Sequence, residues 1–222
     1  MAIHVDPGTV VLYSDVACPW ATLALHRLYA ARAAAHLVDE VRVDHRLFLL
    51  EDVNRAPLSL AQVRAELPVL TALAPEVGWQ PWAGEPADWP VSTLLADEAV
   101  HAAKAQGPAA AEALDLSLRR ALFVEGRTVS LLHEVLDVAD ACPGVDAAAL
   151  RQALDDGRAR GPMMHDYRTH RDEVRGSPHL FLADGSDVFN PGLELSWDGD
   201  VPVVERDDPT DLDRLVRRAA GR

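Results

Sequence analysis

The sequence predicts an α/β protein in which a β-α-β unit and a β-β-α unit flank a large helical insertion. Residues 10–49 show a β-rich run, a helical run and a second β-rich run in succession. The middle of the chain carries apolar residues spaced three and four apart, which is typical of helices. Residues 177–220 return to a β pattern and end in another helical run. We therefore expect parallel strands and a right-handed crossover in the first unit.

The N-terminal unit begins with a short, β-branched apolar run at residues 10–13, which predicts a buried strand. Residues 20–35 contain neither glycine nor proline and predict a helix. One face of that helix carries Ala24, Leu28, Ala31 and Ala35. Residues 41–49 alternate between apolar and polar side chains, which predicts the second strand.

The middle of the chain reads as a helical block. Residues 58–73 are partly helical but contain Pro68, and residues 74–90 form a loop rich in proline, glycine and tryptophan. Its tryptophans either line a substrate wall or pack the insertion against the rest of the protein, and we favour packing. Four predicted helices follow, at residues 92–106, 109–123, 130–141 and 146–156.

The C-terminal unit is predicted to be a hairpin followed by a helix. Residues 177–190 contain two β-rich runs on either side of an Asp184–Gly185 turn. Asp208 and Pro209 then open a helix that extends to about Ala220, with the aspartate as N-cap and the proline in the first turn.

The composition excludes several classes of function. The chain has 222 residues and a formal net charge of −14, which disfavours binding to nucleic acid or to anionic lipid. The N-terminus lacks a basic segment followed by an apolar one, and no apolar stretch approaches the roughly 20 residues that span a bilayer. We expect a cytoplasmic protein whose two cysteines form no permanent disulfide. The nine histidines show no spacing typical of a metal site.

The segment "SDVACPWATLAL" places Cys18 between the first predicted strand and the first predicted helix. Unpaired N–H groups and the positive end of the helix dipole favour a thiolate at such a position, and Pro19 suits the first helical turn. We therefore expect Cys18 to be a nucleophile with a lowered pKa. The alternative interpretation is a buried cysteine that acts as a small apolar side chain.

A second feature lies in "VRGSPHLFL", where Pro178 precedes an apolar run. The proline either marks the start of a strand or forms a cis-proline loop opposite Cys18. In the second case Ser177 offers its backbone to an extended substrate or a thiol ligand. His179 then either approaches Cys18 or has a structural role. We predict a cis Ser177–Pro178 bond beside Cys18.

The chain resembles the DsbA-like branch of the thioredoxin superfamily. The resemblance rests on "YSDVACPWATLAL", the helical insertion, "FVEGRTVS" and "GSPHLFL", and it covers about residues 9–220. More narrowly, the chain is similar to the FrnE-type dithiol oxidoreductases, the kappa-class glutathione transferases and the 2-hydroxychromene-2-carboxylate isomerases. The resemblance implies a thioredoxin fold formed by residues 1–57 and 174–222, with residues 58–173 as the helical insertion domain.

The resemblance also implies the site. Cys18 corresponds to the nucleophile, and the residues that contact a substrate or thiol are Pro19, Trp20, Ser177, Pro178 and His179. Oxidoreductase members carry Cys-Pro-Trp-Cys, whereas this chain has Ala21 at the fourth position. Its resolving thiol is therefore missing, and a separate thiol must release a mixed disulfide. Glutathione or mycothiol is the expected co-substrate.

Three interpretations follow. The first is a thiol-disulfide oxidoreductase that works through one cysteine. The second is a transferase or isomerase of the kappa-class type that depends on glutathione or mycothiol, and the third is a thioredoxin-fold binding module without catalytic activity. We expect no tightly bound cofactor and no metal. The expected partner is a small thiol or disulfide, and the oligomeric state is open, with a homodimer among the options. Cys142 is expected to be a spare thiol.

Overall fold

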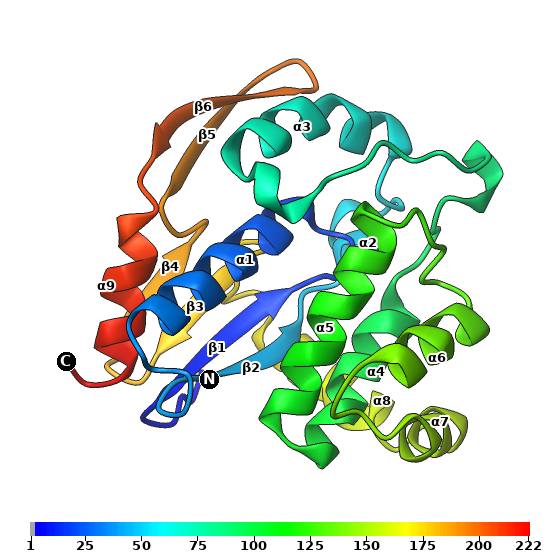
Figure 1. Ribbon diagram of the computed structural model, residues 1–222, viewed down its shortest axis with the longest axis horizontal. Coiled ribbons are helices and arrows are strands. Elements are labelled where there is room, and N and C mark those ends of the chain that lie inside the picture. Colours follow the sequence, from blue (N-terminus) through cyan, green and yellow to red (C-terminus); the bar gives the residue numbers. More distant parts are fainter. Residues whose placement is uncertain (1–2) are drawn as a thin grey trace.

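The computed structural model describes residues 3–222 (Figure 1). The strands are β1 (Thr9–Ser14), β2 (Arg42–Leu47), β3 (His179–Leu182), β4 (Asp187–Phe189), β5 (Leu193–Asp198) and β6 (Val201–Asp207). The α-helices are α1 (Pro19–Ala34), α2 (Leu50–Asn54), α3 (Leu60–Leu73), α4 (Leu94–Ala103), α5 (Pro108–Phe123), α6 (Leu132–Ala141), α7 (Ala147–Asp155), α8 (Arg160–His170) and α9 (Thr210–Ala219). Short 3₁₀ turns are η1 (Pro75–Val77), η2 (Pro86–Asp88) and η3 (Lys104–Gln106).

The main sheet has four strands in the order β2-β1-β3-β4. Strands β1 and β2 are parallel, and β3 is antiparallel to both β1 and β4. The predicted N-terminal unit is therefore present as a β-α-β crossover through α1. The predicted C-terminal hairpin is present as β3 and β4, with its turn at Asp184–Gly185. This topology brings the end of β1 next to the start of β3, because Tyr13 is paired with His179.

The two faces of this sheet are covered by different elements. One face packs against α1 and α9, which lie side by side (Figure 1). Its core consists of Val10, Leu12, Leu25, Leu28, Leu180, Leu182, Leu212, Leu215 and Val216, among others. The opposite face carries Val11, Tyr13 and Phe181. Alternate residues of β1 and β3 thus serve opposite faces, as expected for a sheet covered on both sides.

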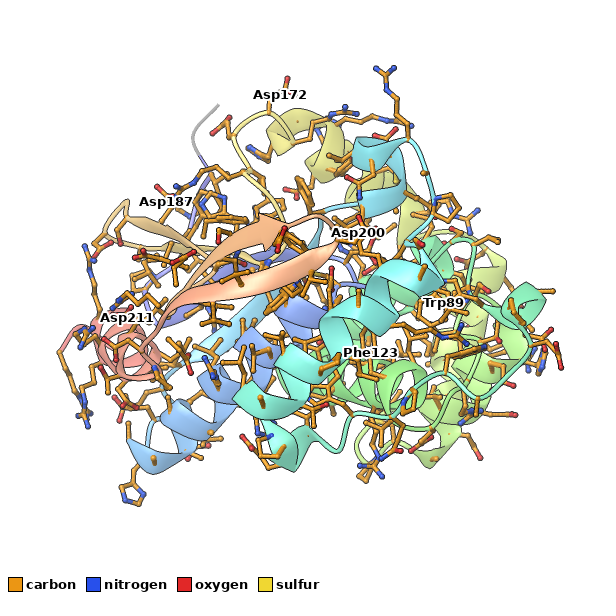
Figure 2. The ribbon with its side chains drawn as sticks, turned by 90° about the horizontal axis from the view of Figure 1, so that it is seen from above. Trp89, Phe123, Asp172, Asp187, Asp200 and Asp211 are labelled. Carbon is orange, nitrogen blue, oxygen red and sulfur yellow. The ribbon has the colours of Figure 1, made fainter. Side chains whose placement is uncertain are left out.

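The insertion has a second core, which is continuous with the N-terminal end of α1. Helices α4 and α5 pack against each other and against β2, and α6 and α7 pack outside them. This core includes Cys18 and Trp20 together with the three tryptophans of the 74–90 loop. Figure 2 shows Trp89 and Phe123 within the crowded side chains of this part of the molecule. The loop tryptophans therefore pack the insertion, as the sequence favoured.

Four elements are absent from the sequence prediction, and the last helix begins later than predicted. Helix α2 follows β2 directly, and α8 is a fifth helix where four were predicted in the second half of the insertion. Strands β5 and β6 form a separate two-stranded sheet in a region that carried no prediction. The last helix begins at Thr210 with Pro209 as its N-cap, one residue later than predicted, and the Asp208 carboxylate accepts the Thr210 N–H at 3.1 Å. The domain division at residues 57/58 and 173/174 stays a prediction.

A buried ion pair connects the insertion to the sheet. The Arg32 guanidinium of α1 donates two hydrogen bonds to the Glu112 carboxylate of α5, at 2.9 and 2.6 Å. The same carboxylate accepts the Val43 N–H of β2 at 2.8 Å. One side chain of the insertion therefore contacts both the crossover helix and the edge strand. None of the helices between residues 3 and 222 combines the length and apolar composition needed to cross a bilayer.

Candidate active site

Cys18 is the N-cap residue of α1. Its backbone is extended, with φ −79° and ψ 111°, and its sulfur accepts the Ala21 N–H at 3.4 Å. Pro19 occupies the first helical turn, where its missing N–H leaves no hydrogen bond unmade. The Cys18 N–H donates to the Asp15 carbonyl at 3.0 Å, which closes the turn between β1 and α1. The sulfur therefore lies at the positive end of the helix, as predicted.

The loop before β3 faces this sulfur. The Ser177–Pro178 peptide bond is cis, as predicted. The Cys18 thiol donates to the Ser177 carbonyl, with Sγ and O separated by 3.2 Å. The Ser177 hydroxyl in turn accepts the Asp15 N–H at 3.2 Å. Cys18, Ser177 and Pro178 thus come together from the two ends of the chain.

Burial sets the acidity of the Cys18 thiol. The residue is 4% exposed, and burial raises the pKa of its thiol to about 11. Contacts with Ser177, with the Ala21 N–H and with the positive charge of Arg119 each lower the pKa, and Glu66 raises it further. The expectation of a lowered pKa is therefore wrong. Desolvation of the thiolate outweighs the helix terminus because the sulfur is enclosed rather than open to water.

Trp20 and Glu66 are buried beside Cys18 in the same core. Glu66 on α3 is 1% exposed, and burial raises the pKa of its carboxyl above the ordinary value. One of its oxygens accepts Gln62 Nε2 at 2.8 Å, and the other has no hydrogen-bond partner among the described residues. The Trp20 indole N–H lies close enough to lower the pKa of this carboxyl without meeting hydrogen-bond geometry. Sequence analysis missed Glu66, because one acidic residue in an amphipathic helix normally indicates an exposed face.

Arg119 of α5 lies beneath the turn that carries Cys18. Its side chain is 1% exposed, and its guanidinium bonds to that turn and to the helix after it. The partners are Ser14 Oγ at 2.9 Å, the Asp15 carbonyl at 3.0 Å, Thr22 Oγ1 at 3.3 Å, the Cys18 carbonyl at 3.4 Å and the Val16 carbonyl at 3.5 Å. Asp115 pairs with its Nε at 2.8 Å. Sequence analysis missed this residue as well, because an arginine normally indicates a solvated position.

His179 does not join Cys18. It lies on the sheet face opposite α1, where its ring packs against Phe181 with centroids 4.3 Å apart. Its Nδ1 accepts the Arg175 N–H at 3.1 Å, and its Nε2 lies 2.7 Å from an Asp187 carboxylate oxygen. Both ring nitrogens are therefore occupied, and burial lowers the pKa of the imidazole. The structure gives His179 a structural role at the start of β3, and its expected contact with a substrate stays a prediction.

Cys142 is a free, buried thiol immediately after α6. Its sulfur accepts the Ser117 hydroxyl of α5 at 3.4 Å. Helix α5 packs against both α1 and α6 and stands between them (Figure 1). Cys142 is thus separated from Cys18 by a helix, which agrees with its interpretation as a spare thiol. Residues 3–222 contain no group of three metal-ligating side chains.

Comparisons with known proteins agree with this geometry. The profile of the DSBA-like thioredoxin domain matches residues 9–198. A probable DsbA oxidoreductase from Streptomyces coelicolor is similar in structure, with a TM-score of 0.66 and 23% identity over 96% of this chain and 90% of that one. No curated protein matches the sequence.

Two further solved structures share the fold. The cytosolic disulfide reductase DsbM from Pseudomonas aeruginosa has a TM-score of 0.59 and 18% identity over 95% of this chain and 97% of that one. The same DsbM solved with GSH gives a TM-score of 0.60. A 2-hydroxychromene-2-carboxylate isomerase has a TM-score of 0.60 and 18% identity over 82% of this chain and 88% of that one.

Proposed function

The chain belongs to the DSBA-like thioredoxin domain family, and on that premise we propose that it catalyses thiol-disulfide exchange through the single sulfur of Cys18. The observation that carries the proposal is the placement of this sulfur, which caps α1 and lies 3.2 Å from the Ser177 carbonyl. One turn further along α1 stands Ala21, which supplies no second thiol. Cys142 lies beyond α5 and is unsuited to replace it.

The proposed reaction has two exchange steps. The Cys18 thiol first releases its proton to solvent, and the thiolate attacks one sulfur of a disulfide RS–SG. A Cys18–SG mixed disulfide forms, and RS⁻ leaves and takes up a proton. A second small thiolate GS⁻ then attacks the mixed disulfide, which releases GS–SG and regenerates the Cys18 thiolate. The substrate disulfide is reduced to RSH and two small thiols are joined, so that atoms and electrons balance. Ala21 makes the second step intermolecular, because the chain supplies no internal attacking sulfur at that position.

The proposed co-substrate is a low-molecular-weight thiol, either glutathione or mycothiol, in a cytoplasmic setting. Support comes from the solved DsbM structure with GSH, whose fold this chain shares. Support also comes from the site itself, because the Ser177 backbone lies next to the Cys18 sulfur, at the position where an extended thiol peptide would pair with it in place of the Cys18 thiol. Trp20 and Pro178 line one small pocket, and Pro19 follows Cys18 at the start of α1; these three residues form the proposed contact surface.

A second candidate function is a transferase or isomerase that uses a bound thiol. The specific observation that favours it is the enclosure of Cys18, which is 4% exposed and whose thiol pKa burial raises to about 11. A neutral S–H group donates a hydrogen bond, and such a donor stabilises the thiolate of a bound ligand without attacking it. In that case Cys18 orients the thiol of the ligand and forms no covalent bond.

Mass spectrometry of the intact protein separates these functions. We incubate the wild type, Cys18→Ser and Cys142→Ser with oxidised glutathione and then with oxidised mycothiol. A covalent adduct on the wild type and on Cys142→Ser, but not on Cys18→Ser, supports the exchange reaction. Saturable binding of reduced thiol without any adduct supports the transferase or isomerase. An adduct that requires Cys142 contradicts the single-cysteine proposal.

A further inference from the structure

Arg119 is a buried cation that the proposed reaction does not yet use. Its guanidinium donates to three carbonyls and two hydroxyls that belong to residues 14–22, and its own helix supplies only Asp115. Helix α5 of the insertion therefore holds the turn that carries Cys18. Arg119 and Cys18 are 101 residues apart in the sequence. A bond network this dense around one side chain fixes the backbone of the turn.

The identity of this side chain matters for that role. A guanidinium is planar and presents five N–H donors in a fixed fork, so that it bonds several acceptors at once. A lysine ammonium is a point charge with three donors and does not reproduce the fork. Leaving the carbonyls of the turn without donors also costs free energy, because they are buried. The geometry thus requires arginine rather than any cation.

The charges around Cys18 give Arg119 a second role. The groups that face the thiol from other elements are Glu66 on α3 and Arg119 on α5, and of these Glu66 disfavours the thiolate. Asp97 on α4 and Asp15 in the turn lie close to Arg119, and burial raises the pKa of each carboxyl. Among the groups acting on the thiol, Arg119 supplies the positive charge.

We propose that Arg119 is the positioning residue for the chemistry at Cys18: it fixes the turn that presents the sulfur and supplies the positive charge that a buried thiolate needs. The positioning role rests on the proposed exchange reaction. The effect of the Arg119 charge concerns only the acidity of the Cys18 thiol, and alkylation measures it without the exchange reaction. The helical insertion would then be part of the active site rather than a cover over it.

The experiment compares Arg119→Gln and Arg119→Lys with the wild type. Arg120→Gln is the matched control, because Arg120 is the next residue of α5 but is exposed and pairs with Glu125. The rate of iodoacetamide alkylation is measured at several pH values for each cysteine by peptide mass mapping. Cys142 in the same molecule serves as the internal reference for general loosening of the fold.

We expect Arg119→Gln to lower the alkylation rate of Cys18 by about tenfold at any pH below the midpoint, which corresponds to one pKa unit. The ratio of the Cys18 rate to the Cys142 rate falls by the same factor. Arg119→Lys retains the charge, so its Cys18 alkylation stays within about threefold of the wild type, while kcat for exchange with a glutathione mixed disulfide falls by about tenfold or more. Arg120→Gln behaves like the wild type in both measurements.

Two results would overturn the proposal. If Arg119→Gln leaves the Cys18 rate unchanged, or changes both cysteines equally, the arginine has only a structural role. If the Arg119→Lys variant exchanges disulfides at the wild-type rate, the guanidinium hydrogen bonds of Arg119 do not position the Cys18 sulfur. Should Arg119→Gln fail to fold, Arg119→Lys alone decides the positioning role. A wild type without any exchange activity refutes the proposed function, and the alkylation comparison then still decides the role of the charge.

Discussion

At Cys18 the local and the tertiary environment act in opposite directions. The helix N-terminus and Arg119 favour the thiolate, whereas enclosure in a core favours the thiol, and enclosure prevails. The position of Cys18 at the start of α1 was predictable from the sequence, because a strand, a cysteine, a proline and a helix occur in that order. Its acidity was not predictable, because burial arises from α3 and the insertion, whose contacts no local pattern encodes.

The raised pKa predicts a loss of stability at alkaline pH. The Cys18 thiol has an ordinary pKa of 9.0 and a pKa of about 11 in the folded chain, so the unfolded chain releases this proton first. The stabilising contribution is complete below about pH 9 and is lost as the pH rises through about 11. Two pKa units correspond to about 3 kcal/mol.

Urea unfolding between about pH 8 and pH 11 measures this effect. The free energy of unfolding of the wild type should decline more steeply above pH 9 than that of Cys18→Ser. Cys142→Ser, which retains Cys18, should follow the wild type. Parallel declines for all three proteins would show that the Cys18 pKa is not raised.

Ala21 stands where the resemblance to the dithiol oxidoreductases places a second cysteine. Its N–H already contacts the Cys18 sulfur, and its side chain is buried one turn along the same helix. We predict that Ala21→Cys forms a reversible disulfide with Cys18 and gains insulin-reducing activity. Ala24→Cys, on the next turn of α1, is the control and should form no such bond. Absence of the disulfide under mild oxidation would contradict the geometry drawn around Cys18.

At the scale of elements, the helices and strands with regularly spaced apolar residues were predictable from the sequence. The elements that polar or tertiary contacts stabilise were not. Helix α8 is polar and buries only Met163, Tyr167 and His170, so its apolar period is weak. Strands β5 and β6 carried a signal in their Asp198–Gly199 turn. No local pattern shows that these strands pair only with each other and not with the main sheet.

The entry into this second sheet depends on Gly192. Its φ is +76°, and a Cβ at this position would lie 2.5 Å from the Asp208 carbonyl oxygen, which is part of the backbone and unable to move aside. Gly185 has a similar φ of +83° but no atom within 4 Å of its would-be Cβ. Both glycines therefore have a positive φ, but only at Gly192 would a Cβ clash with a neighbouring atom.

We predict that Gly192→Ala destabilises the protein more than Gly185→Ala does. Both lose about 1 kcal/mol to the left-handed backbone, and Gly192→Ala loses about 1–3 kcal/mol more to the clash. Thermal or urea unfolding of the two variants measures the difference directly. Equal destabilisation would show that the backbone near Asp208 adjusts without cost.

At the scale of the whole molecule, the insertion and the sheet are one structural unit. The core that contains Cys18 continues through the insertion helices, and Glu112 joins α5 to α1 and to β2. An ion pair at such a junction is costly to break, because removal of one partner leaves a buried charge uncompensated. The layout of a split fold with an insertion was predictable from the order of segments. The contacts that join its parts were not.

We predict that Glu112→Gln destabilises the whole chain by about 3–5 kcal/mol. Tryptophan fluorescence, which reports mainly on the insertion loop, and the protection of Cys18 from alkylation should lose their folded signals at one common urea concentration. Glu125→Gln, which breaks the exposed pair with Arg120, is the control and should cost less than about 1 kcal/mol. Separate midpoints for the two probes would show that the insertion unfolds on its own.

Enclosure of Cys18 also affects how fast its thiol reacts with peroxide. Peroxide converts a thiol to sulfenic and then sulfinic acid through its accessible thiolate. Cys18 is protonated at neutral pH and covered, and Cys142 is 5% exposed. We therefore expect both cysteines of the folded protein to react slowly with peroxide.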